Sequence, residues 1–119
     1  MSDRPGSVPA DPLGLLGIAR RAGQVAMGFD AAMRSVTRGQ ARLLVLARDV
    51  GESTADKVRR SAGEVPVVVL GEKESLGKAL GRGETGVVAV TDGGFSRALM
   101  SRSNEEVMSS VNAGKDAGL

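Results

Sequence analysis

The chain contains neither cysteine nor histidine among its 119 residues. This absence excludes a disulfide scaffold, a zinc ribbon, a thiol nucleophile, a Ser-His triad and any metal site that needs histidine. Tryptophan and tyrosine are also absent, and Phe29 and Phe95 are the only aromatic residues. A protein that stacks successive bases on exposed rings is therefore not expected. Any chemistry must come from carboxylates, hydroxyls, lysine and arginine.

The two ends of the chain differ in composition from its middle. Residues 1–11 are polar and rich in proline, and they predict a flexible leader instead of a signal peptide. Residues 103–119 lose strong periodicity and predict a loosely ordered tail. No apolar run approaches the roughly 20 residues that span a membrane. We therefore expect one folded domain, residues 12–102, in a cytoplasmic protein that does not contact membranes.

Arginine is unevenly distributed along the chain. The formal net charge is only +2, but residues 13–48 contain six arginines and a single acid, Asp30, for a net charge of +5. A one-sided arginine excess favours a polyanionic partner. The alternative is a charged face that meets only solvent, and charge alone does not decide between the two.

Helical and strand-like apolar patterns alternate along almost the whole chain. Helical stripes predict helices at Leu13–Ala22, from Phe29 until Gly39, from an N-cap at Ser53, at Lys73–Leu80, and from a cap at Asp92. Apolar runs predict strands at Gln24–Met27, Leu43–Ala47, Val65–Leu70 and Val87–Val90. This alternation predicts an α/β fold with helices on both faces of a central sheet of about four strands.

Residues 81–86 spell G-x-G-x-x-G, a motif that is typical of dinucleotide-binding loops. That mechanism needs the motif to follow a strand and to open a helix. Here the motif follows a predicted helix and enters the strand Val87–Val90, so it indicates a connecting loop. A nucleotide-dependent enzyme would rest on this failed motif alone. We therefore expect no enzymatic activity, no cofactor and no metal site.

Several separate blocks of the sequence resemble one family. Residues 65–81, VPVVVLGEKESLGKALG, resemble the P-x-x-x-x-x-x-K-x-x-L-G-x-A-x-G block of the kink-turn RNA-binding ribosomal protein superfamily, of the archaeal seven-Ae and eukaryotic thirty type. Residues 28–49 are similar to the family's first helix-to-strand unit. LGIARRAG at 16–23 and VTDGGF at 90–95 resemble its bacterial YlxQ-like branch. The resemblance implies a single-domain, three-layer α/β/α sandwich with a mixed sheet.

The resemblance also implies a function, the recognition of structured, kink-turn-like RNA by a protein associated with the ribosome or with translation. Ribosomal or ribonucleoprotein proteins are further expected partners. In the family, an Asn-Glu pair and a Lys at the start of the second helix reach sheared G·A pairs, and an apolar loop covers an extruded base. The residues expected to contact RNA here are Gly28, Asp30, Ala31, Arg34, Arg38, Arg82, Gly83, Glu84 and Thr85.

Three of these residues, Asp30, Ala31 and Arg34, stand where the family has Asn, Glu and Lys. Arg34 has the geometry to donate a two-pronged hydrogen bond to guanine, and its alternative role is an ion pair with Asp30. Arg38 and Arg82 are expected to contact phosphates.

Two features depart from the family pattern. Ala31 has no acceptor for a guanine amino group, and the loop at residues 82–86 is polar where the family's loop is apolar. We expect Gly83–Thr85 to form an adaptable loop. The sequence leaves open a second interpretation, a protein-interaction module that retains the fold but has lost specific kink-turn recognition.

Overall fold

The strands of this protein are apolar on both faces, and helices cover each face. The computed structural model describes residues 11–102 and 107–108. The helices are α1 (Pro12–Arg21), α2 (Phe29–Thr37), α3 (Glu52–Ala62), α4 (Lys73–Ala79) and α5 (Gly93–Arg102). The strands are β1 (Val25–Met27), β2 (Leu43–Leu46), β3 (Val67–Val69), β4 (Val87–Val90) and β5 (Val107–Met108).

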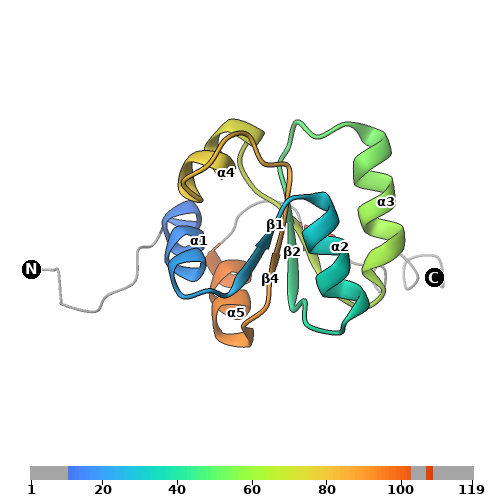
Figure 1. Ribbon diagram of the computed structural model, residues 1–119, viewed down its shortest axis with the longest axis horizontal. Helices are drawn as coiled ribbons and strands as arrows, with labels where there is room; N and C mark the ends of the chain where they lie inside the picture. Colours follow the sequence, from blue (N-terminus) through green and yellow to red (C-terminus); the bar gives the residue numbers. More distant parts are fainter. Residues whose placement is uncertain (1–10, 103–106, 109–119) are drawn as a thin grey trace, which may run out of the picture.

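The sheet separates two helical layers. Helices α1, α4 and α5 lie on one face, and α2 and α3 lie on the other (Figure 1). Alternate residues of β2 point to opposite faces: Leu43 and Val45 pack with the first layer, whereas Leu44 and Leu46 pack with the second. All four are at most 1% exposed. The three-layer α/β/α sandwich expected from the sequence is therefore confirmed.

The sheet is mixed, with strand order β1-β4-β2-β3-β5. Strands β2 and β3 are parallel, while the β1–β4, β2–β4 and β3–β5 pairs are antiparallel. The expected sheet of about four strands is thus extended by the two-residue edge strand β5, which lies within the segment predicted as a loose tail. No sign of this strand is visible in the sequence, because two residues are too few to show the alternation of apolar and polar residues that is typical of a strand. The predicted leader, residues 1–10, and the rest of the tail lie outside the described residues.

The N-terminal caps of the helices agree only in part with the caps predicted from the sequence. Asp92 caps α5 as predicted, accepting a hydrogen bond from the Phe95 N–H at 2.8 Å. The predicted N-cap at Ser53 is wrong, because the N-cap of α3 is Gly51, two residues earlier, and the helix begins at Glu52. Asp11, predicted to belong to the leader, caps α1 by accepting from the N–H groups of Leu13 and Gly14. None of the helices among the described residues combines the length and apolarity that crossing a bilayer requires.

Candidate functional site

A single glycine connects β1 to α2. Gly28 has φ 96° and ψ 161°, a backbone region that essentially only glycine adopts. Its N–H donates to the carbonyl oxygen of Val87 at 2.8 Å. This bond fixes the start of α2 beside the start of β4, where the loop of residues 80–86 ends. We call the start of α2 (residues 28–34) together with this loop the α2–loop surface.

The first turn of α2 presents free backbone donors. Gly28 supplies no side-chain cap, and within the described residues the N–H groups of Phe29, Asp30 and Ala31 have no hydrogen-bond partner. Unpaired N–H groups at a helix start carry partial positive charge, which favours anions such as phosphate. Asp30 is exposed on the same turn and is its one acidic residue.

The loop between α4 and β4 is anchored at several points. The Arg82 N–H donates to the Gly77 carbonyl at 2.8 Å, and the Thr85 N–H donates to the Lys73 carbonyl at 3.0 Å. A Cβ atom on Gly77 would overlap the carbonyl group of Gly83, so helix and loop are in direct backbone contact. The loop is therefore more constrained than the adaptable segment expected from its glycines.

The loop residues divide into exposed and buried positions. Arg82, Gly83 and Glu84 are exposed, as expected for residues that meet a partner. Thr85 is only 4% exposed, and its hydroxyl donates to the Gly83 carbonyl at 2.9 Å. The side chain of Thr85 therefore shapes the loop and does not face solvent, contrary to the contact role expected of it. Its place in a G-x-G-x-x-G pattern gave no signal of this burial.

Lys73 is a candidate that the sequence interpretation did not select. Its side-chain carbons lie 3.7 and 3.8 Å from the position of a Cβ atom built on Gly86, so its stem runs along the end of the loop. Its backbone N–H donates to the Asp49 carboxylate at 2.8 Å. Within the described residues its ammonium group has no ion-pair partner. Lys73 is the lysine of the P-x-x-x-x-x-x-K block at residues 65–81, and that match was the signal in the sequence that could have identified it.

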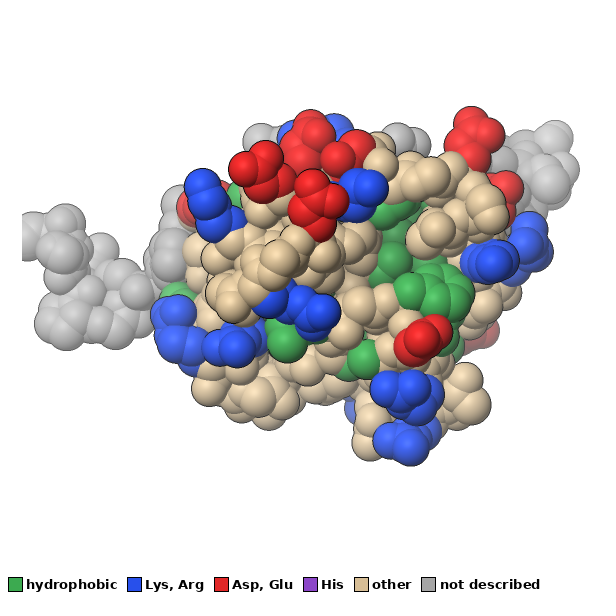
Figure 2. Space-filling view, turned by 45° about the horizontal axis from the view of Figure 1, so that its top comes forward, with side chains coloured by type: hydrophobic (Ala, Val, Ile, Leu, Met, Phe, Trp, Pro, Cys, Tyr) green, Lys and Arg blue, Asp and Glu red, His purple; other side chains and the backbone are tan. Residues whose placement is uncertain are grey.

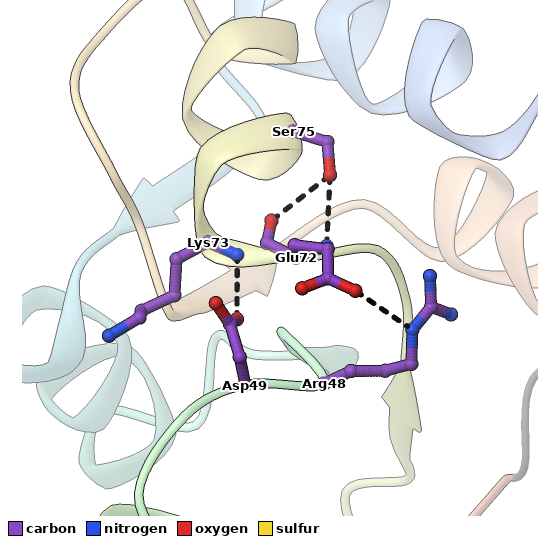
Figure 3. A network of polar contacts seen from close by, with 5 residues as sticks. All are labelled: Arg48, Asp49, Glu72, Lys73 and Ser75. Carbon is purple, nitrogen blue, oxygen red and sulfur yellow. Dashed lines mark hydrogen bonds and ion pairs between the residues drawn. The ribbon is translucent and has the colours of Figure 1, made fainter.

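A polar network holds the start of α4 in place (Figure 3). The carboxylate of Glu72 lies 3.6 Å from the guanidinium of Arg48, and the Ser75 hydroxyl accepts from the Glu72 N–H at 2.9 Å. Together with the Asp49 bond, these contacts join the segment after β2 to the first turn of α4. Figure 3 shows the side chain of Lys73 extending to the opposite side from the Arg48–Glu72 pair. The network therefore positions Lys73 without neutralising it.

The arginines of α2 follow one side of that helix. Arg34 and Arg38 are both exposed and lie one helical turn apart. The ion pair between Asp30 and Arg34, weighed as an alternative role, is not formed within the described residues. Arg38 lies at the end of α2, away from Gly28 and the loop. The structure thus brings the other eight expected residues to the α2–loop surface and places Arg38 apart from it.

The surface around this site is unevenly charged. Figure 2 shows a group of acidic side chains at the top of the view, basic side chains at its lower left, lower edge and right, and exposed apolar surface near the centre. Phe29, Met33 and Val50 are partly buried apolar residues that pack on the α2–α3 side of the sheet. Val50 also lies close to the loop, with its Cγ1 atom 2.7 Å from the position of a Cβ atom on Gly86. A partner at this site meets positive charge, free N–H donors and a small apolar area.

Comparison with known proteins assigns the fold to a family. The model of the ribosomal protein L7Ae/L30e/S12e/Gadd45 family matches residues 13–100. The chain belongs to this family. Among curated L7Ae-type relatives, it is 36% identical over 89 residues to the RNA-binding protein YlxQ of Bacillus subtilis, covering 73% of this chain and 89% of that one. It is 29% identical over 100 residues to the large ribosomal subunit protein eL8 of Thermoplasma volcanium, covering 82% and 83%.

Solved structures agree with the fold. A protein of unknown function from Bacillus halodurans superposes with a TM-score of 0.75 at 38% identity, covering 79% of this chain and 97% of that one. A Giardia lamblia 15.5 kD RNA binding protein superposes with a TM-score of 0.66 at 22% identity, covering 76% and 79%, and supports the fold. The curated relatives are an RNA-binding and a ribosomal protein, not enzymes, so the expectation of a non-enzymatic protein is confirmed. Over the part of the chain that the structure describes, no cluster of acidic side chains could hold a metal ion.

Proposed function

We propose that this protein binds structured, kink-turn-like RNA through the α2–loop surface, as a cytoplasmic component associated with the ribosome or with translation. The observation that carries the proposal is the bond between the Gly28 N–H and the Val87 carbonyl. This bond sets free N–H donors, Arg34 and an exposed loop side by side. The names of the bacterial YlxQ and archaeal eL8 relatives support RNA as the partner.

The donors of this surface suit two kinds of RNA contact. The N–H groups of the first turn of α2 bind phosphate oxygens, which positions the RNA without reading its sequence. Arg34 has two parallel N–H groups that match the O6 and N7 acceptors of guanine. Because Arg34 makes no ion pair within the described residues, binding RNA breaks no existing contact of its side chain. Lys73 and Arg82 add positive charge beside the loop.

Asp30 and Ala31 set the limits of the base contacts. The carboxylate of Asp30 accepts hydrogen bonds from guanine amino groups, which the methyl group of Ala31 does not. Asp30 therefore takes over the acceptor role that a glutamate at position 31 would have. Each missing base contact costs about 1–3 kcal/mol of discrimination. We expect G·A pairs to be recognised, with a smaller preference than a surface carrying an Asn-Glu pair would give.

The apolar surface beside the loop supports the binding of an extruded base. The loop itself exposes Gly81, Arg82, Gly83 and Glu84, so it offers no apolar cover. Phe29 and Val50 are partly exposed instead, one at the first position of α2 and the other next to Gly86. Stacking on an aromatic ring contributes about 1–3 kcal/mol per base. We propose that the extruded base packs on this apolar area.

Binding of the purified chain to a labelled kink-turn RNA tests the function. The matched control is the same RNA with its G·A pairs replaced by Watson–Crick pairs. We expect tighter binding to the kink-turn RNA, by about tenfold for one retained guanine contact. Equal, salt-sensitive binding to both RNAs would indicate a protein that contacts only the RNA backbone and would contradict kink-turn recognition. Absence of binding to either RNA would contradict the function altogether and favour a protein partner.

A further inference from the structure

A basic groove adjoins the α2–loop surface and follows α2 from Ala31 to the end of the helix. It runs between α2 and the edge strand β1 and has a volume of about 610 Å³. Three arginines line it: Arg34, Arg38 and Arg42. None of the described residues that line it is acidic. A cleft walled by charge of one sign concentrates counter-ions, so this groove favours an anionic ligand.

The three guanidinium groups are available to a ligand. All three arginines are exposed, and within the described residues none of their side chains makes an ion pair or a hydrogen bond. Arg34 and Arg38 are about 6 Å apart along the helix axis. Arg42 reaches the groove from the segment before β2, where its backbone N–H donates to the Val90 carbonyl at 2.7 Å. Guanidinium groups bind phosphate oxygens in pairs, which suits a ligand with several phosphates.

A buried hydroxyl in the wall of the groove gives an independent indication. Ser35 lines the groove and is 4% exposed, and its hydroxyl has no hydrogen-bond partner within the described residues. Burial without a partner is unfavourable for a hydroxyl, and beside three arginines without ion pairs it favours a ligand that brings an acceptor into the groove. A phosphate oxygen is an acceptor that satisfies it. The exposed side chain of Gln40, which also lines the groove, supplies a further amide donor.

We propose that this groove is a second binding site, for phosphate groups of the RNA strand that continues past the α2–loop surface. The proposal rests on the proposed function, because Arg34 belongs to both surfaces and joins them. The groove holds the backbone through Arg38, Arg42 and Gln40, and so contributes affinity without sequence preference. Reading of the G·A pairs stays with the start of α2.

The variant Arg42→Ala tests the groove without changing the α2–loop surface, because Arg42 belongs only to the groove. The matched control is Arg97→Ala, which removes an exposed arginine from α5, in the opposite helical layer. Affinity is measured at several salt concentrations for the kink-turn RNA and for the same RNA without G·A pairs. We expect Arg42→Ala to weaken both RNAs by the same factor, about three- to tenfold, and to reduce the salt slope by about 0.7–0.9. Arg97→Ala leaves both quantities unchanged.

The outcomes distinguish failure of the groove from failure of the function. Equal affinities and slopes for Arg42→Ala and Arg97→Ala, with RNA binding intact, would overturn the groove alone. No RNA binding by the unmodified chain would overturn the proposed function and the groove together. Saturable binding of inorganic phosphate in the groove without competition by RNA would assign it to a free phosphate ligand. Saturable binding of a polyglutamate peptide there, again without competition by RNA, would assign it to an acidic protein strand.

Two serines provide a matched test of the buried hydroxyl. Ser35 and Ser96 are each 4% exposed with an unpartnered hydroxyl, but only Ser35 lines the groove. We expect Ser35→Ala to weaken RNA binding severalfold and Ser96→Ala to leave it unchanged. Equal RNA affinities of the two variants would show that the Ser35 hydroxyl does not contact RNA.

Discussion

Arg34 offers the sharpest test of how the α2–loop surface reads RNA. Its side chain is exposed and makes no ion pair or hydrogen bond within the described residues, so its removal breaks no intramolecular contact. Alanine is also a good helix former at this position. We therefore expect Arg34→Ala to change the free energy of unfolding by no more than about 0.5 kcal/mol. Any loss of RNA affinity then reports a lost intermolecular contact.

The magnitude of that loss depends on what Arg34 contacts. A two-pronged hydrogen bond to guanine contributes about 1–3 kcal/mol, which corresponds to a loss of about 5- to 150-fold in affinity. Arg34→Lys separates this contact from a simple phosphate contact, because lysine keeps the charge but loses the fork. We expect the lysine variant to retain the salt slope and to lose only part of the preference for G·A pairs, because a lysine, which the family has at this position, keeps a single donor for guanine.

A direct assay is fluorescence anisotropy with a labelled RNA, since the chain lacks tryptophan and tyrosine. Arg97→Ala is again the control for the loss of one positive charge. Thermal unfolding of each variant checks that the fold is unchanged. Equal affinities for Arg34→Ala and Arg97→Ala would refute the assignment of Arg34 to the RNA contact. An unchanged G·A preference in Arg34→Lys would instead refute the two-pronged hydrogen bond of Arg34 to guanine.

Three further changes, two of them with a control substitution, test how the site is positioned. Gly77→Ala introduces a Cβ atom that overlaps the Gly83 carbonyl, and we expect it to lower the free energy of unfolding by about 1–3 kcal/mol and to weaken RNA binding. Gly83→Ala has no heavy atom within 4 Å of its new Cβ and should leave stability unchanged in the same denaturation assay. Asp49→Ala removes the acceptor of the first N–H of α4 and should lower the free energy of unfolding by about 0.5–2 kcal/mol. Its control, Asp56→Ala, removes only an exposed ion pair and should lower that free energy by no more than about 0.5 kcal/mol. Gly28→Ala places a side chain at φ 96° and should lower the free energy of unfolding, measured by chemical denaturation, by about 1–3 kcal/mol. An unchanged denaturation midpoint would contradict the requirement for glycine between β1 and α2.

The layers and the central strands were predictable because their signals are local. The apolar run from Leu43 to Ala47 indicates a strand covered on both faces, and each of its residues is indeed buried. The cap at Asp92 is also a local signal, which the bond from the Phe95 N–H confirms. Where the helix start depends on distant contacts, the sequence misleads. Ser53 has the right residue type for a cap, but Val50 packs into the core and Asp49 is tied to α4, so the helix begins before Ser53.

The site was only partly predictable for the same reason. The start of α2 follows from the helical stripe and from the family resemblance, which together select Asp30 and Arg34. The burial of Thr85 depends on how the loop folds back onto α4, a contact that no motif in the loop indicates. The groove brings together Arg38, Arg42 and strand β1, and no sequence motif links these elements.

Residue-resolved mapping of the RNA interface shows whether RNA contacts the α2–loop surface. The measurement is the change of backbone amide shifts in the isotope-labelled chain as the kink-turn RNA is added. We predict the largest changes at the free N–H groups of Phe29, Asp30 and Ala31 and at the exposed loop residues Gly83 and Glu84. Changes confined to α3 or α5, with these amides unmoved in an RNA-bound chain, would show that RNA binds elsewhere on the protein.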